Sequence, residues 1–104
     1  MQGFYDATFS REMGCTEAEW LGWLPAALGD HPWHRQGACV SIDVCNADGS
    51  QGQLRILWQV GEVRQIALVS IPRLLVDFRF EGLTDAQRHV FMRRFDLYMQ
   101  RGGG

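Results

Sequence analysis

The chain has 104 residues, 46% of them hydrophobic and 21% charged, with a net charge of −2 at pH 7. This length suits one domain with a packed core. The hydrophobic content argues against a disordered chain, and the slight negative charge argues against nucleic-acid binding, which usually needs a basic excess.

The first predicted strand spans residues 4–11, where aromatic and small residues alternate with polar ones. A capping box, Thr16-Glu17-Ala18-Glu19, then predicts the start of a helix. Pro25 is expected to kink this helix or start a new turn, and Gly29 is expected to end it. The apolar residues of the helix share one wide face: Trp20, Leu21, Trp23, Leu24, Ala27 and Leu28.

A polar turn is predicted over residues 30–37, and four strands are expected after it. Residues 39–45 and 53–60 alternate apolar and polar side chains, which is typical of a sheet with one buried face. Residues 63–71 are apolar on both faces, which favours a central strand. Residues 73–80 alternate again. Pro72 is expected to lie in a turn between two strands rather than at a bend in one long strand.

The C-terminal helix is predicted from a second capping box, Thr84-Asp85-Ala86-Gln87, to about Arg101. One of its faces is expected to pack on the sheet, with Phe91, Met92, Phe95, Tyr98 and Met99.

The complete pattern predicts a single α+β domain over residues 1–101, followed by a flexible glycine tail over residues 102–104. An antiparallel meander sheet of four to five strands carries a helix from the N-terminal half and the long C-terminal helix on one face, in the order β-α-β-β-β-β-α. This order is similar to that of a shortened helix-grip domain, a likeness that implies no function.

Two segments contain residue types found in catalytic or metal sites. His31-Pro32-Trp33-His34 lies near Cys39 and Cys45. Those cysteines are six residues apart, about 20 Å along a strand, so they cannot bind one zinc ion together. Cys15 precedes a helix, whose amides lower the pKa of a thiol, but the sequence places no histidine base beside it. We therefore favour a non-enzymatic protein with no metal and no cofactor.

The ending Arg101-Gly102-Gly103-Gly104 resembles the Arg-Gly-Gly ending of ubiquitin-like and sulfur-carrier proteins. That resemblance would imply that the glycines enter an activating enzyme. It covers four residues, and here they follow a predicted helix, whereas in that family they follow a strand. We therefore interpret the ending as a plain chain terminus.

The three cysteines are an odd number, and residues 1–6 lack the basic and apolar regions of an export signal. No apolar run approaches the roughly 20 residues that span a bilayer. These features predict a cytoplasmic protein with reduced thiols and no membrane contact.

The functional prediction depends on a second apolar stripe of the C-terminal helix, on the side opposite the sheet. We expect an assembly module that forms a homodimer through this stripe, or that binds an acidic protein partner, using Ala86, Val90, Arg93, Arg94, Leu97 and Arg101. The alternative is a domain that binds a small apolar ligand between sheet and helix, in a pocket lined by Trp58, Phe78, Phe80, Phe91 and Phe95.

Overall fold

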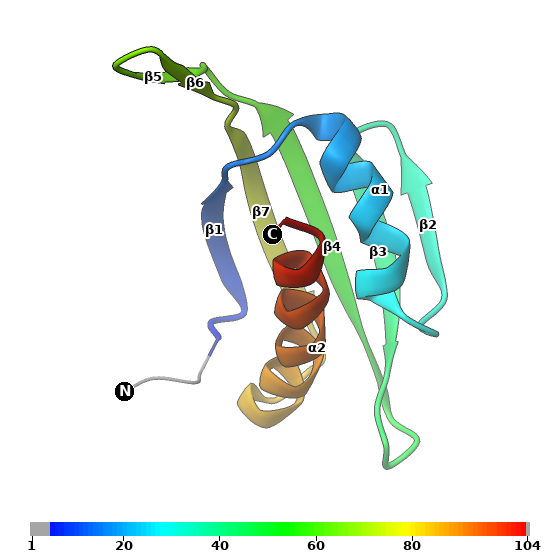
Figure 1. Ribbon diagram of the computed structural model, residues 1–104. Helices are drawn as coiled ribbons and strands as arrows, with labels where there is room; N and C mark the ends of the chain where they lie inside the picture. Colours follow the sequence, from blue (N-terminus) through cyan, green and yellow to red (C-terminus); the bar gives the residue numbers. More distant parts are fainter. Residues whose placement is uncertain (1–4, 104) are drawn as a thin grey trace.

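The computed structural model describes the backbone of residues 5–103 and the side chains of residues 5–100. Both helices, α1 (Glu17–Leu28) and α2 (Asp85–Gly103), cover the same face of an antiparallel sheet (Figure 1). The sheet has five strands in the order β1 (Thr8–Met13), β7 (Leu74–Glu81), β4 (Gln51–Val60), β3 (Cys39–Cys45) and β2 (Trp33–Gln36). A separate two-stranded hairpin consists of β5 (Arg64–Ile66) and β6 (Val69–Ile71). The predicted α+β class is confirmed.

One face of the sheet is buried because apolar residues alternate with polar ones along its three central strands. In the register, Ile56 of β4 lies opposite Val40 of β3 and Phe78 of β7, and all three are fully buried. The residues between them point to the other face, which neither helix covers. Ten predicted inward positions on these strands are confirmed: Val40, Ile42, Val44, Leu54, Ile56, Trp58, Leu74, Val76, Phe78 and Phe80. Val60, expected on the same face of its strand as Trp58, is exposed instead, because β4 ends there.

The core between sheet and helices is built around three large side chains that are fully buried. Phe95 of α2 packs edge-on against Phe78 of β7, with ring centroids 5.5 Å apart, and against Trp20 of α1, at 6.0 Å. Edge-to-face packing of this kind adds to the free energy gained from burial. Phe95 therefore joins three elements that are distant in the sequence.

Both predicted capping boxes form. The Thr16 hydroxyl accepts the Glu19 amide N–H at 3.1 Å, and the Glu19 carboxylate accepts the Thr16 N–H at 2.9 Å. Thr84 and Gln87 make the equivalent pair at the start of α2. Gly29 ends α1 with φ +67°, and α1 continues through Pro25. α2 continues to Gly103, whereas the expected end was near Arg101.

The segment predicted as a central strand is the main error. Residues 63–71 form no strand of the large sheet but a short hairpin that reverses at Ala67 and Leu68 and extends beyond both helices (Figure 1). Pro72 joins no two antiparallel strands, because β6 leads into β7 in the same direction; it lies at the bend where the hairpin leaves the sheet. The expected chain reversal at Pro72 was therefore wrong.

Two smaller corrections concern the edges of the sheet. Residues 33–36, predicted as part of a turn, form the edge strand β2. All four of its side chains are exposed, and three are polar, so they gave no alternation to detect. The first strand was predicted over residues 4–11 but runs from Thr8 to Met13. Residue 4 lies outside the described part of the chain.

Candidate functional site

The side of α2 that faces away from the sheet carries the residues predicted to bind a partner. The core-facing side holds Phe91, Met92, Phe95 and Met99, all buried. The opposite side forms a surface that we call the α2 strip: Ala86, Val90, Arg93, Arg94 and Leu97, all exposed. Val90 is 70% exposed and Leu97 is 47% exposed. The side chain of Arg101, also predicted here, lies outside the described side chains.

The two arginines of the strip differ in their contacts. Arg94 lies over the Tyr98 ring, 4.4 Å from its centroid, and donates to the Ala26 carbonyl at 3.4 Å. Arg93 makes no ion pair with any described residue. Arg11 and Arg88, in contrast, are each held by a carboxylate, that of Asp96 and that of Asp85.

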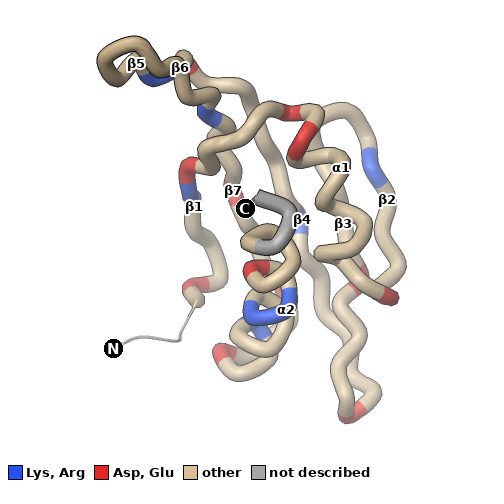
Figure 2. The backbone as a smooth tube through the Cα atoms, in the orientation of Figure 1, with Lys and Arg blue, Asp and Glu red and all other residues tan. Residues whose placement is uncertain are grey.

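The arginines of the whole molecule do not gather on one face. Figure 2 shows basic positions on β1, β2, β4, α2 and at the base of the hairpin. On the outer sheet face, Asp77 accepts a hydrogen bond from Ser10 and Asp43 accepts one from Gln53. The molecule therefore has no single basic face, and the arginines considered for partner binding are those of the α2 strip.

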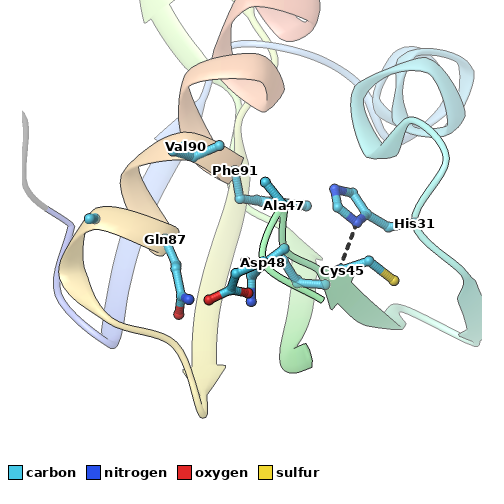
Figure 3. Close-up of a pocket in the computed structure, with 10 residues that line it drawn as sticks. His31, Cys45, Ala47, Asp48, Gln87, Val90 and Phe91 are labelled. Carbon is cyan, nitrogen blue, oxygen red and sulfur yellow. Dashed lines mark hydrogen bonds between the residues drawn. The ribbon is translucent and has the colours of Figure 1, made fainter. Parts of the chain in front are cut away.

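A groove of about 290 Å³ adjoins the N-terminal end of the strip. It lies between α2, the turn that joins β3 to β4, and His31 from the α1–β2 connection (Figure 3). Its apolar lining includes Val44, Ala47, Val90 and Phe91. Val90 belongs to both the groove and the strip, so the two form one continuous surface.

His31 closes one side of this groove in a fixed orientation. Its Nδ1 accepts the Cys45 backbone N–H at 3.0 Å, and its ring lies 5.4 Å from that of Phe91 (Figure 3). Burial, and next the nearby Arg94 guanidinium, lower the pKa of His31 below its usual value, while Asp30 opposes this effect. The neutral ring suits this role, because a protonated Nδ1 could no longer accept the bond.

The five residues predicted to line a ligand pocket lie together between the sheet and the helices, where their side chains fill the core. Phe80 and Phe91 pack edge-on with centroids 6.2 Å apart, and Phe91 and Phe95 are stacked at 6.1 Å. Trp58 packs on Trp20 and donates to the Glu17 carboxylate at 2.9 Å. Of the five, Phe91 alone lines the groove. Ligand binding stays a prediction.

The hairpin is the exposed surface that the sequence reasoning missed. In the described residues, eight large hydrophobic side chains are exposed, and five of these lie between residues 60 and 69: Val60, Val63, Ile66, Leu68 and Val69. Their exposed fractions run from 53% to complete exposure. A signal was present in the sequence: Gly61 and Pro72 bracket the segment, and both residue types interrupt strands.

Two candidate reactive groups have surroundings unlike those of a catalytic site. Cys15 is buried, and burial, together with the Glu19 carboxylate, raises the pKa of its thiol, the opposite of the lowering expected from the helix start. In the part of the chain that the structure describes, no three His, Cys, Asp or Glu side chains are grouped so that they could hold a metal ion.

Comparison with known proteins adds no family to this picture. No protein-family model matches the chain, and no curated protein matches its sequence. Within residues 5–103, neither helix is long and apolar enough to cross a membrane. The function is therefore inferred from the residues of this chain alone.

Proposed function

We propose that this chain is a non-enzymatic assembly module that self-associates through the α2 strip. The supporting observation is the exposure of Val90 and Leu97 on the side of α2 that faces away from the sheet. Removing apolar surface from water is the main driving force of protein association. In the proposed assembly, a second copy of the chain covers these two side chains.

The charges of the strip indicate which side chains the covering surface of the second copy should contain. Arg93 is exposed and makes no ion pair with any described residue. An arginine at the rim of an interface favours a carboxylate on the opposing surface, which sets the orientation of the partner more than its affinity. The covering surface should therefore combine apolar side chains with an acidic group.

Sedimentation equilibrium over the micromolar range tests self-association directly. We expect a mass above that of the 11.8 kDa single chain, with a concentration dependence that gives the dissociation constant. Val90→Glu and Leu97→Glu should each weaken association by about tenfold or more, because each places a charge in a desolvated contact. Neither change disturbs the core, since both side chains are exposed.

Gln59→Glu is the matched control, because it adds the same charge to an exposed position of β4, outside the strip. We expect it to associate as the unaltered protein does. A single-chain mass at every concentration would refute self-association. Equal dissociation constants for the control and the two strip variants would refute the strip as the contact.

A further inference from the structure

The imidazole of His31 takes the place of a missing strand carbonyl at the end of β3. Asp43 of β3 points its backbone N–H toward the β2 side, where the Pro32 carbonyl accepts it at 2.8 Å. Cys45, two residues farther on, points its N–H the same way, because alternate residues of a strand face the same neighbour. β2 begins only at Trp33, and the His31 Nδ1 accepts the Cys45 N–H at 3.0 Å. A side chain therefore adds the last hydrogen bond between this connection and β3.

The same ring forms a wall of the groove. It lies 5.4 Å from the Phe91 ring of α2, and its hydrogen bond fixes the α1–β2 connection to the end of β3, where the turn to β4 begins (Figure 3). His31 and Phe91 both line the groove. We call the bond between His31 and Cys45 the His31 latch. Without it the ring would be free to rotate away, and the groove would lose this wall.

The charged and titratable groups around His31 come from three segments. Arg94 of α2 places a positive charge near the ring, and Asp30 of the α1–β2 connection places a negative one there. Asp48, in the turn between β3 and β4, and the Cys45 thiol line the same groove. Burial has the largest effect on the pKa of His31 and lowers it, Arg94 lowers it further, and Asp30 opposes both. The ring is therefore neutral at neutral pH.

Protonation would turn the acceptor of the His31 latch into a donor. A neutral imidazole that accepts at Nδ1 carries its hydrogen on Nε2, whereas an imidazolium carries hydrogens on both nitrogens. The new Nδ1–H would face the Cys45 N–H, so two donors would stand where a donor and an acceptor had been 3.0 Å apart. The ring would also add a positive charge near that of Arg94. Both effects oppose the position that the ring holds in the neutral state.

From this geometry we infer that the His31 latch is released by acid: it holds at neutral pH and opens the groove when the imidazole takes up a proton. The inference goes beyond the proposed self-association and does not depend on it. The latch should be complete above about pH 6.5, the ordinary pKa of histidine, and should be lost as the pH falls through the lower pKa of the folded ring. Because the unfolded chain takes up this proton more readily, acid destabilises the latched state.

A pH titration followed by nuclear magnetic resonance tests the latch in the unaltered protein. Between about pH 7.5 and about pH 5, the His31 ring and the Cys45 amide should shift with one common midpoint, below about pH 6.5. After correction for the intrinsic pH dependence, the Cys45 amide should exchange with solvent about tenfold faster or more on the acid side. The Asp43 amide, which donates to a carbonyl instead, is the internal control and should change much less. A Cys45 amide that did not respond across this range would overturn the inference.

Substitution of the ring and of its two charged neighbours identifies the source of the response. His31→Gln cannot titrate in this range, so the Cys45 response should disappear, whereas His34→Gln, which removes an exposed histidine of β2, should leave it unchanged. Arg94→Gln removes a positive charge but keeps an N–H donor, so the midpoint should move to higher pH. Asp30→Asn should move it to lower pH. A Cys45 response that persisted in His31→Gln, or that vanished in His34→Gln, would assign the effect to another group and overturn the latch.

Discussion

The chain segments that form β4 and β7 are covered by the helices along most of their length, but their continuation into the hairpin is not. Over most of their length the two strands pair beneath α1 and α2, and Trp58 and Val76 are buried there. Beyond Val60 and Leu74 the same segments continue into the hairpin, where Ile66 and Val69 pair with each other but stay exposed. Both parts carry large apolar side chains. Burial is therefore set by the length of the covering helices, not by the composition of the strand.

Removing one apolar side chain from each part should have very different effects on stability. Phe95→Ala should lower the free energy of unfolding by about 3–5 kcal/mol, because it leaves a cavity where Phe78 and Trp20 meet. Ile66→Ala in the hairpin should cost less than about 1 kcal/mol, since half of that side chain is already in water. Urea denaturation followed by tryptophan fluorescence measures both, at a concentration where the protein is a monomer. Similar losses at the two sites would mean that the hairpin is packed in solution.

The sequence contained enough information for the covered part of the fold. Alternation along residues 39–45, 53–60 and 73–80 identified the inward side chains correctly except Val60, because a sheet with helices on one face imposes a period of two. Thr16 and Thr84 located both helix starts, because capping is a local interaction between residues three apart. These features depend on neighbours in the sequence, so a single chain can reveal them.

The hairpin could not be predicted in the same way, because its exposure depends on distant elements. Apolar residues on both faces of 63–71 are typical of a buried central strand, and nothing within the segment shows that α2 lies too far away to cover it. The groove has the same limitation: His31, Ala47 and Phe91 meet only after three separate connections are folded. Helical periodicity alone was enough to predict the outward stripe of α2. The groove beside it could not be predicted in this way.

At the end of β4 opposite the hairpin, a substitution is expected to change the stability by an intermediate amount. Gly52 is buried, and a Cβ added there would lie 2.5 Å from the Leu83 side chain and 2.8 Å from the Glu81 carbonyl oxygen. Because the carbonyl belongs to the backbone and cannot rotate away, Gly52→Ala should destabilise the fold by about 1–3 kcal/mol. Gly22→Ala is the matched control: no atom lies within 4 Å of its added Cβ. That change should stabilise α1 by about 0.5–1 kcal/mol.

The two glycine variants make the same chemical change in different surroundings. Denaturation midpoints should move in opposite directions. If Gly52→Ala were neutral, the β4 end beside Leu83 would be as loosely packed as the hairpin, and the contrast between the two ends of β4 would disappear. Adding Leu83→Ala to Gly52→Ala should recover part of the loss, but not the part due to the Glu81 carbonyl.

The smallest expected effect is at the turn of the hairpin. A non-glycine residue in the left-handed region costs about 1–2 kcal/mol, and glycine there loses about 0.5–1 kcal/mol through its greater freedom in the unfolded chain. Ala67→Gly should therefore stabilise the closed hairpin by about 0.5–1 kcal/mol. Since the hairpin opens without disturbing the core, the midpoint of global unfolding should hardly move.

Amide hydrogen exchange detects such a local change. The amides that close β5 on β6 should exchange about two- to fivefold more slowly in Ala67→Gly than in the unaltered protein, while amides of β4 and β7 beneath the helices should be unchanged. Uniform slowing across the sheet would contradict this expectation, because it would show that hairpin and core open as one unit. No slowing anywhere would mean that residue 67 carries no strain in solution. The expected pattern would show that the hairpin opens independently of the core.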